Sequence, residues 1–278
     1  MTLTTGMDAL RTARQCCTAE CFGYHATWRL FRRAGLKGTP AWHTGFYRTA
    51  LTRWQPPAGG RIRVLVAGAA DETVLRVLEA LLGTRRLEVH LVDACPTPLH
   101  LAQAYAYWSG LLLEPRQDRA PELATCHSPF DLIVTDGLLS LLHTPAHRAA
   151  TVRRFAELLT DEGMLLYTTR IAGRAGVLEY DRLGRHLTAA AAAATWPGSP
   201  RARLRLAQHL RTRRSRAAPF ASPGDLAAAV AGDFGQVRLH TRRAAHTVPI
   251  ALAPSVLAGH GSTSVGIAAT APAPGGRP

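Results

Sequence analysis

Asp93 and the small residues around Gly68 are the first positions whose types and spacing indicate chemistry. Gly68-Ala69-Ala70 follows one short apolar run, and Asp93 ends a second apolar run 25 residues after Gly68. Small residues let a ligand approach the backbone closely, and a helix start offers N–H groups that have no partner within the helix. In strand-helix-strand units, a carboxylate at this distance accepts hydrogen bonds from ribose hydroxyls. The pattern therefore indicates a site for a cofactor that contains a nucleoside.

Two strands and one helix must hold these residues in place. The apolar run Val64–Val66 is typical of a strand that is buried on both faces. Asp71 is a good N-cap for a helix whose apolar residues share one face, and Gly83 closes that helix. The run from Leu87 to Val92 predicts the second strand, with Asp93 at its tip. The sequence therefore predicts a strand-helix-strand unit with an acid at its second tip.

This unit and two later segments resemble the class I S-adenosylmethionine-dependent methyltransferases. VLVAGAADETVL and VHLVDACPTPL are similar to the first two motifs of that family, and FDLIVTDGLL and LLTDEGMLLYTTRI to its later strand motifs. The resemblance spans residues 61–171 and, more weakly, the C-terminal part. Where the family commonly has three glycines in its first motif, this chain keeps only Gly68. The resemblance implies a Rossmann-like α/β fold, with a seven-stranded, mostly parallel sheet, helices on both faces and an N-terminal helical cap.

The chain is expected to divide into a cap and a sheet domain. Helices are predicted for residues 8–34 and 41–54, ahead of a linker rich in Pro and Gly. Residues 1–58 are therefore expected to form the helical cap. Residues 59–278 are expected to form the Rossmann-like S-adenosylmethionine-binding domain, in which residues 271–278 are a disordered tail.

The resemblance also implies which residues hold S-adenosylmethionine. Asp118 stands where the family often places an acid near the adenine amino group, and a loop acid without this role is the alternative. The tip of the predicted strand Phe130–Val134 would face the methionine end of the cofactor and the substrate. The cofactor-binding residues expected in this way are Gly68, Ala69, Ala70, Asp71, Asp93, Ala94, Asp118, Asp136, Gly137 and Leu138.

Three residues are candidates for the catalytic machinery: Asp136, His143 and Tyr180. Asp136 could hold the cofactor amino group, position a nucleophile or cap the following turn. His143 is nearer to the strand tip than His147 and could act as a general base near neutral pH. Tyr180, on a predicted helix, could point back toward the pocket.

The N-terminal cap is expected to line the substrate pocket, since such extensions in this family often fold over the cofactor. The candidates are Tyr24, His25 and Trp28, and the same reasoning extends to His43 and Tyr47. Ordinary core packing is the alternative for these aromatic residues.

Cys16, Cys17, Cys21 and His25 raise the question of a metal ion. Cys17, Cys21 and His25 recur every four residues, which would align them on one face of a helix. A continuous helix would spread the first and last of these by about 12 Å, too far for one ion. We therefore predict no metal and interpret the cysteines as buried thiols.

Composition sets limits on the class of protein. The chain has 278 residues, 47% of them hydrophobic, and a net charge of +14. The chain has five cysteines, an odd number, and no signal peptide ahead of them, which favours a cytoplasmic protein. No apolar run reaches the length of a membrane span. Only one of the 33 basic residues is a lysine, which also fits a GC-rich coding sequence. Residues 201–216 are interpreted as a basic helix with a solvated face.

Methyl transfer from S-adenosylmethionine to a small molecule, in bacterial specialised metabolism, is the function that these features favour. One alternative is a cyclase or lyase that converts S-adenosylmethionine itself into azetidine-2-carboxylate and methylthioadenosine. Another is a basic protein that binds or methylates RNA. The expected partner is a small-molecule substrate, and no association with a membrane is expected. Binding of nucleic acid and formation of a homodimer remain open alternatives.

Overall fold

The computed structural model describes residues 6–18, 21–22, 24–26, 28, 40–57, 60–127, 129–171, 199–201, 204, 208, 220–243 and 263–271. Its helices are α1 (Gly6–Cys16), α3 (Pro40–Leu51), α4 (Thr73–Leu82), the 3-10 turn η1 (Thr84–Arg86), α5 (Pro96–Ser109), α6 (Leu138–Leu141), α7 (Pro145–Leu158) and α10 (Pro223–Ala231). Its strands are β1 (Ile62–Ala67), β2 (Leu87–Asp93), β3 (Leu112–Gln117), β4 (Phe130–Asp136), β5 (Leu159–Ile171), β6 (Gln236–Arg243) and β7 (Thr263–Thr270).

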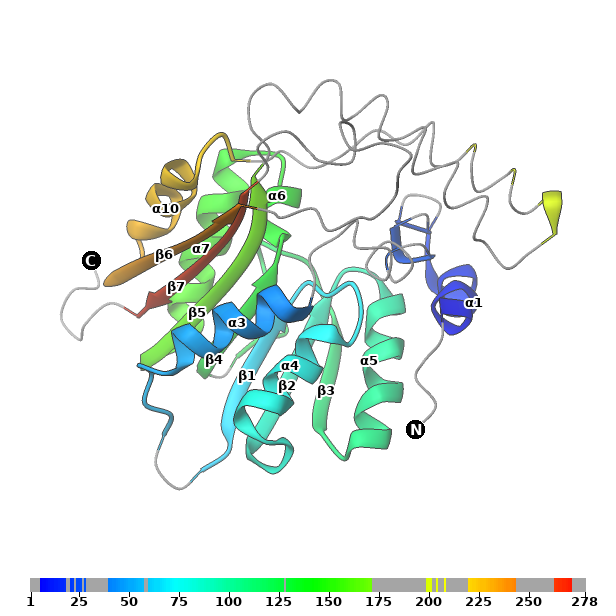
Figure 1. The fold of residues 1–278 in the computed structure, drawn as a ribbon, viewed down its shortest axis with the longest axis horizontal. Helices are drawn as coiled ribbons and strands as arrows, with labels where there is room; N and C mark the ends of the chain where they lie inside the picture. The colour runs from blue at the N-terminus through cyan, green and yellow to red at the C-terminus, as the bar shows by residue number, and fades with distance from the viewer. Residues whose placement is uncertain are drawn as a thin grey trace.

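All seven strands form one sheet in the order β3-β2-β1-β4-β5-β7-β6 (Figure 1). Strands β1 to β5 pair in parallel, whereas β7 runs antiparallel to both β5 and β6. The strand order reverses between β1 and β4, which is where open α/β sheets bind ligands beyond the carboxyl ends of their strands. The predicted seven-stranded, mostly parallel sheet is confirmed.

Strand register brings the predicted site residues to one edge of the sheet. Val66 of β1 lies between Leu91 of β2 and Val134 of β4. The chain segments that follow these three residues therefore leave the sheet together. Asp93 and Asp136, which end β2 and β4, flank the turn after β1.

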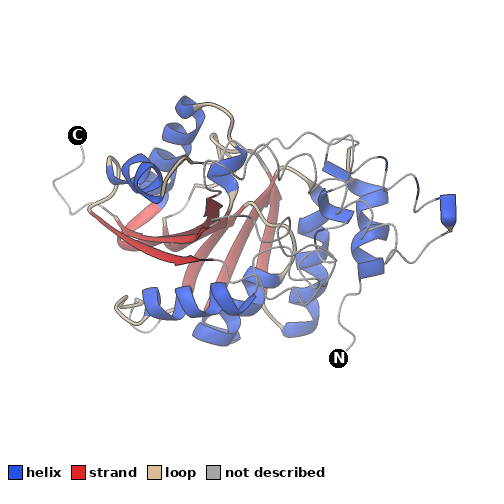
Figure 2. Ribbon diagram, turned by 45° about the horizontal axis from the view of Figure 1, so that its top comes forward, coloured by secondary structure: helices blue, strands red, loops and turns tan. Residues whose placement is uncertain are grey.

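Helices cover both faces of the sheet, as Figure 2 shows. On one face, α3, α4 and α5 pack their apolar side chains against β1, β2 and β4. On the other face, α7 packs against β5, and α10 packs against β6, β7 and α7. Val64, Leu65 and Val66 are almost fully buried because β1 lies between these two layers. This burial explains why its apolar residues form an unbroken run rather than an alternating one.

Helix α3 belongs to the core of the sheet. Phe46, Tyr47 and Trp54 share one buried cluster with residues of β1 and β4. Gly266 of β7 lies under the Phe46 ring, and a Cβ built there would be 2.7 Å from Phe46 Cδ2. The fold thus places α3 directly on the sheet, and the boundary at residue 58 stays a prediction.

The N-terminal segment departs from its predicted continuous helix over residues 8–34. Helix α1 ends at Cys16, and residues 17–18 are not helical. Neither Gly nor Pro stands at this break, so local sequence gives no stop signal there. α1 packs beside α5, as Figure 1 also shows.

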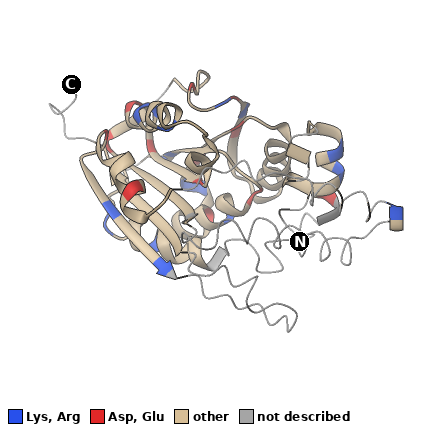
Figure 3. Ribbon diagram, turned by 90° about the horizontal axis from the view of Figure 1, so that it is seen from above, with Lys and Arg blue, Asp and Glu red and all other residues tan. Residues whose placement is uncertain are grey.

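Several predicted segments lie outside the described residues, among them the helix that carries Tyr180, most of the basic run 201–216 and residues 272–278. In the part of the chain that the structure describes, the arginines are spread over several separate elements (Figure 3). No helix within these described ranges is both long and apolar enough to cross a bilayer.

Candidate functional site

The turn after β1 is tight and depends on glycine. Gly68 has a φ of +72°, and its N–H donates to the carbonyl of Val92 over 2.8 Å. A Cβ at Gly68 would be 3.3 Å from Cδ1 of Leu138, so the segment after β4 closes against this turn. The positive φ and the close neighbour both favour a residue without a side chain.

Asp93 ties this turn to the one that follows β2. Its Oδ2 accepts the Ala69 N–H over 2.9 Å, and its Oδ1 accepts the Cys95 N–H over 2.7 Å. Burial raises the pKa of Asp93 to about 6, although these two N–H donors lower it. The carboxyl is therefore mostly ionised at neutral pH. An ionised carboxylate has about four lone-pair positions, so acceptor capacity remains after these two bonds.

Asp71 contacts the start of α4 but is not its N-cap, which corrects the prediction by one residue. Its Oδ1 accepts the Thr73 N–H over 3.0 Å, and the Asp71 side chain is buried. Because α4 begins at Thr73, Glu72 rather than Asp71 occupies the position directly before the helix. Ala70 lies between the Gly68 turn and Asp71 and is half-buried.

The end of β4 carries a second carboxylate with two neighbours. Asp136 Oδ1 accepts the Thr168 hydroxyl over 2.9 Å, and Asp136 Oδ2 lies 3.5 Å from His43 Nε2. Alternation along β4 puts Asp136 on the same face as Leu132 and Val134, which is the face that α3 covers. The strand therefore aims Asp136 at the helix that carries His43.

His43 is the residue whose contact with Asp136 the sequence reasoning missed. It lies in α3, is only 2% exposed and stacks on Tyr47 with ring centroids 5.9 Å apart. Its Nδ1 is buried and has no hydrogen-bond partner among the described residues. A buried polar atom of this kind is costly, so a bound ligand or water that satisfies it would be favoured.

The segment after Asp136 is held firmly from the opposite face. Gly137 has a φ of +74° and donates its N–H to the Thr168 carbonyl over 2.7 Å. Ser140 Oγ lies 3.2 Å from the Tyr167 hydroxyl and 3.0 Å from Thr169 Oγ1. This buried network fixes α6 and with it Leu138, the residue that closes against Gly68.

Asp118 organises its own loop beyond β3. It accepts the N–H of Arg119 at Oδ1, and at Oδ2 the N–H and hydroxyl of Thr125. Burial alone would raise the pKa of Asp118, but these hydrogen bonds lower it below its ordinary value. The structure thus gives Asp118 a loop-capping role, and its predicted contact with adenine stays a prediction. Ala94 accepts the Gln117 side-chain N–H at its carbonyl oxygen.

His143 does not share the buried setting of His43. It lies in the exposed segment between α6 and α7, while His43 is the histidine that the fold brings to Asp136. The sequence argument chose His143 because it follows β4 closely along the chain. Distance along the chain does not reveal His43, which comes from a helix that precedes the sheet, and the catalytic role of His143 stays a prediction.

The predicted pocket residues Tyr24, His25 and Trp28 lie together in the N-terminal segment. The Tyr24 ring is 4.9 Å from the His25 ring and 4.9 Å from the Trp28 ring. His25, however, gathers with Cys17, Cys21 and Cys95, and the potential ligand atoms of these four residues all lie within 4.8 Å of one another. We expected one continuous helix to keep Cys17 and His25 too far apart for one ion. The helix is not continuous, so that expectation was wrong.

A hollow of about 430 Å³ lies elsewhere, between the C-terminal end of α3 and strands β5, β6 and β7. Arg53, Glu162, Met164 and His240 contribute to its lining. Met164 pairs with Leu132, near the start of β4, whereas Asp136 ends β4 and pairs with Thr168, so this hollow lies toward the opposite end of the sheet from Asp136.

No protein-family model matches the sequence, and no curated protein matches it. Solved structures do match. A candidate O-methyltransferase from Nostoc punctiforme PCC 73102 is 13% identical over 96% of this chain and 69% of its own, with a TM-score of 0.52. A Bordetella parapertussis protein described as a possible exported protein is 19% identical over 83% of this chain and 67% of its own, with a TM-score of 0.50.

A third match, EvdMO1, is 15% identical, and this chain spans only 41% of its length, with a TM-score of 0.47. At such identities the likeness concerns the fold. The match to the Nostoc punctiforme structure, together with the strand order and the reversed β7, shows that the chain has a Rossmann-like fold of the methyltransferase type.

Proposed function

We propose that this protein transfers a methyl group from S-adenosylmethionine to a small molecule, at a nucleophile that carries a proton. The observation that carries the proposal is the position of two carboxylates, Asp93 and Asp136, on either side of the Gly68 turn. They flank the point where the strand order reverses, which is where this class of sheet binds its ligands.

The residues at the ends of β1 and β2 fit the nucleoside part of S-adenosylmethionine. Gly68 has a positive φ and Leu138 close by, which both disfavour a side chain, and Ala69 and Ala70 are small enough for a ligand to approach the backbone. Asp93 is ionised near neutral pH and keeps acceptor capacity for ribose hydroxyls. These residues would bind the nucleoside, while Gly137 and Leu138 would border the methionine end.

His43 and Asp136 would serve the acceptor. The cofactor supplies a methyl group that its sulfonium makes electrophilic, so much of the catalysis can come from alignment. An acceptor hydroxyl must still lose its proton, and an imidazole is suited to remove it. Asp136 Oδ2, 3.5 Å from His43 Nε2, would orient the ring, which leaves the buried Nδ1 available to a ligand. An acceptor that bears an exchangeable proton therefore fits this site.

Calorimetric titration with S-adenosylmethionine and S-adenosylhomocysteine tests the proposal, with the wild type, Asp93→Ala and Asp131→Ala. Asp131 is a matched control, since its Oδ2 accepts the Arg63 N–H over 2.8 Å at the other end of the sheet. We expect micromolar binding by the wild type and Asp131→Ala, and at least about tenfold weaker binding by Asp93→Ala.

Mass spectrometry of the same mixtures separates methyl transfer from the cyclase alternative. Intact cofactor in the absence of an acceptor supports the proposal and justifies an acceptor screen. Rapid formation of methylthioadenosine would contradict it, since the cofactor would then be the substrate. Failure of the wild type to bind either compound would overturn the cofactor assignment.

A further inference from the structure

We propose that Cys17, Cys21, His25 and Cys95 bind one zinc ion. The potential ligand atoms of all four lie within 4.8 Å of one another. Cys95 Sγ is 3.6 Å from both Cys17 Sγ and Cys21 Sγ. Tetrahedral zinc with Zn–S bonds of about 2.3 Å holds its sulfur ligands about 3.8 Å apart. The cluster is therefore already close to the dimensions of a zinc site.

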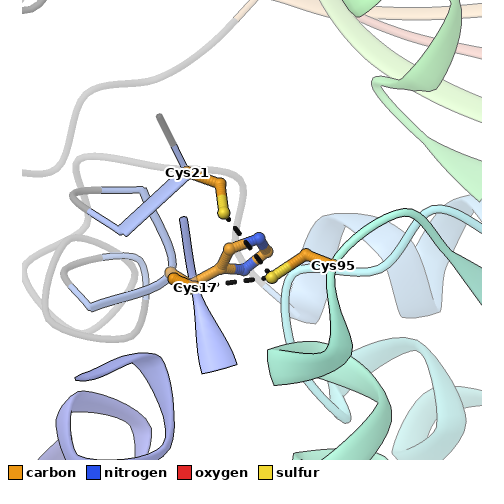
Figure 4. A group of neighbouring side chains, drawn as sticks. Cys17, Cys21 and Cys95 are labelled. Carbon is orange, nitrogen blue, oxygen red and sulfur yellow. Dashed lines mark hydrogen bonds between the residues drawn. The ribbon is translucent and has the colours of Figure 1, made fainter. Parts of the chain in front are cut away.

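The fold brings these ligands together from distant parts of the chain. Figure 4 shows Cys17 and Cys21 in the N-terminal segment facing Cys95, at the start of α5. The break after Cys16 allows Cys17 to turn toward the residues that follow it. Cys21 and His25 are four residues apart in the next helical stretch, so their side chains share a face. Such a convergence of separate segments is how structural zinc sites are built.

The donor set selects among metals. Three thiols and one imidazole form a Cys₃His set, which is typical of closed structural zinc sites. Magnesium and calcium prefer oxygen ligands, so this set does not suit them. In iron–sulfur clusters at least some ligands bind different iron atoms, which spreads them farther apart than the 4.8 Å within which all four ligand atoms lie here. Zinc is thus the metal that the site fits best.

Neighbouring groups would support the thiolates. Thr97 Oγ1 lies 3.0 Å from Cys17 Sγ, and the Thr97 side chain is fully buried. Its hydroxyl can donate to a zinc-bound sulfur, as outer groups at metal sites commonly do. Cys95 directly precedes α5, a helix of 14 residues, whose N-terminus favours negative charge.

A disulfide explains the cluster less well. A disulfide joins two sulfurs at about 2.05 Å, whereas Cys95 is equally far from two different cysteines. It would also leave one thiol and His25 in the cluster without a role. One zinc ion uses all four residues.

Zinc would fasten the N-terminal segment to the sheet next to the cofactor site. The Cys95 N–H donates to Asp93 Oδ1, so a metal held by Cys95 would steady the turn that orients this carboxylate. This consequence for cofactor binding rests on the proposed function, whereas zinc binding itself does not.

Metal analysis of the full-length protein, reconstituted with zinc under reducing conditions and then desalted, tests the site. The variants are Cys17→Ser, Cys21→Ser and Cys95→Ser, and the control is Cys16→Ser, which changes a neighbouring cysteine outside the cluster. We expect about one zinc per chain in the wild type and in Cys16→Ser, and at least about tenfold less in the three cluster variants.

Cobalt substitution of the wild type gives a second readout that does not depend on the folding of a variant. Tetrahedral Co²⁺ with thiolate ligands should produce intense visible bands and sulfur-to-cobalt charge-transfer absorption. A wild type that retains no zinc and gives no such spectrum overturns the proposal. Equal zinc content in all variants, or a disulfide within the cluster of the protein as purified, would do the same.

Discussion

His43 Nε2 lies 3.5 Å from Asp136 Oδ2, although the two residues come from a helix before the sheet and from the end of its fourth strand. The pair forms because β4 alternation turns Asp136 toward the face that α3 covers. His43 is almost fully buried there, so Asp136 and the stacked Tyr47 restrict its ring. A histidine oriented by a carboxylate is an arrangement suited to general-base catalysis.

Replacing His43 by Gln should lower kcat about 10² to 10⁴-fold, because the acceptor loses the group that removes its proton. The dissociation constant of S-adenosylmethionine should change little, since the proposed function assigns the nucleoside to Asp93 and the Gly68 turn. Asp136→Asn should also lower kcat. The double variant should lose less than the product of the two single effects, because both residues act as a unit. Steady-state kinetics with an accepted substrate, beside calorimetry, measure these effects.

His90→Gln is the matched control for this change. His90 Nδ1 lies 2.9 Å from Glu114 Oε2, which makes it a second histidine-carboxylate pair, but within β2 and β3. The kcat of His90→Gln should equal that of the wild type. If His43→Gln kept full activity, His43 would have only a packing role.

Asp93 should give cofactor binding and stability opposite pH dependences. Its folded pKa of about 6 lies above its ordinary value of 3.8, so the folded protein binds the extra proton more tightly between these values. The contribution of Asp93 to stability therefore rises as the pH falls from 6 toward 4. S-Adenosylmethionine binding should weaken over the same window, by up to about tenfold per pH unit, because the protonated carboxyl is a poorer acceptor.

Calorimetry and urea unfolding at several pH values measure both slopes. In Asp93→Asn, neither the stability nor the cofactor affinity should show the pH dependence that Asp93 contributes, whereas Asp131→Asn should keep the wild-type pattern. A cofactor affinity that stays constant down to pH 4.5 in the wild type would rule out a ribose contact by ionised Asp93.

The fold was predictable because the strands are buried on both faces. Residues such as Val64, Leu65 and Val66 leave an unbroken apolar run that local sequence reveals, and Asp93 and Gly68 stand at the ends of such runs. Strand tips follow directly from strand positions. The carboxylates Asp93 and Asp136 could therefore be located without any tertiary information.

The partners of those carboxylates depend on how separate elements dock, which periodicity does not encode. His43 was one of several aromatic or imidazole side chains on its helix, and packing contacts such as that between Phe46 and Gly266 decide which side meets the sheet. Cys95 is separated from Cys17 by 78 positions, so spacing within the N-terminal segment could not reveal it as the fourth member of the cluster. The signal present was a cysteine two residues after Asp93.

Gly68→Ala should destabilise the protein more than Gly110→Ala. Both glycines have a φ of +72°, so both substitutions carry the same backbone strain of about 1 kcal/mol. Only at Gly68 does the new Cβ meet a neighbour, Leu138 Cδ1 at 3.3 Å, whereas Gly110 has open space. Urea unfolding measures the difference, and Gly68→Ala should also weaken cofactor binding. Equal losses in the two variants would show that Leu138 moves away without cost.

Gly266→Ala should lower the free energy of unfolding by about 1 to 3 kcal/mol, because its Cβ would lie 2.7 Å from the Phe46 ring. Since Phe46 and His43 share α3, the displaced helix should also reduce kcat. Phe46→Leu should relieve the overlap, so the loss in the double variant should be at least about 0.5 kcal/mol smaller than the sum of the single losses. Gly232→Ala, which meets no neighbouring atom, is the control and should not be destabilising. Additive losses in the double variant would mean that the contact between Phe46 and Gly266 does not set the position of α3. A normal kcat in Gly266→Ala would mean that catalysis does not depend on the position of α3.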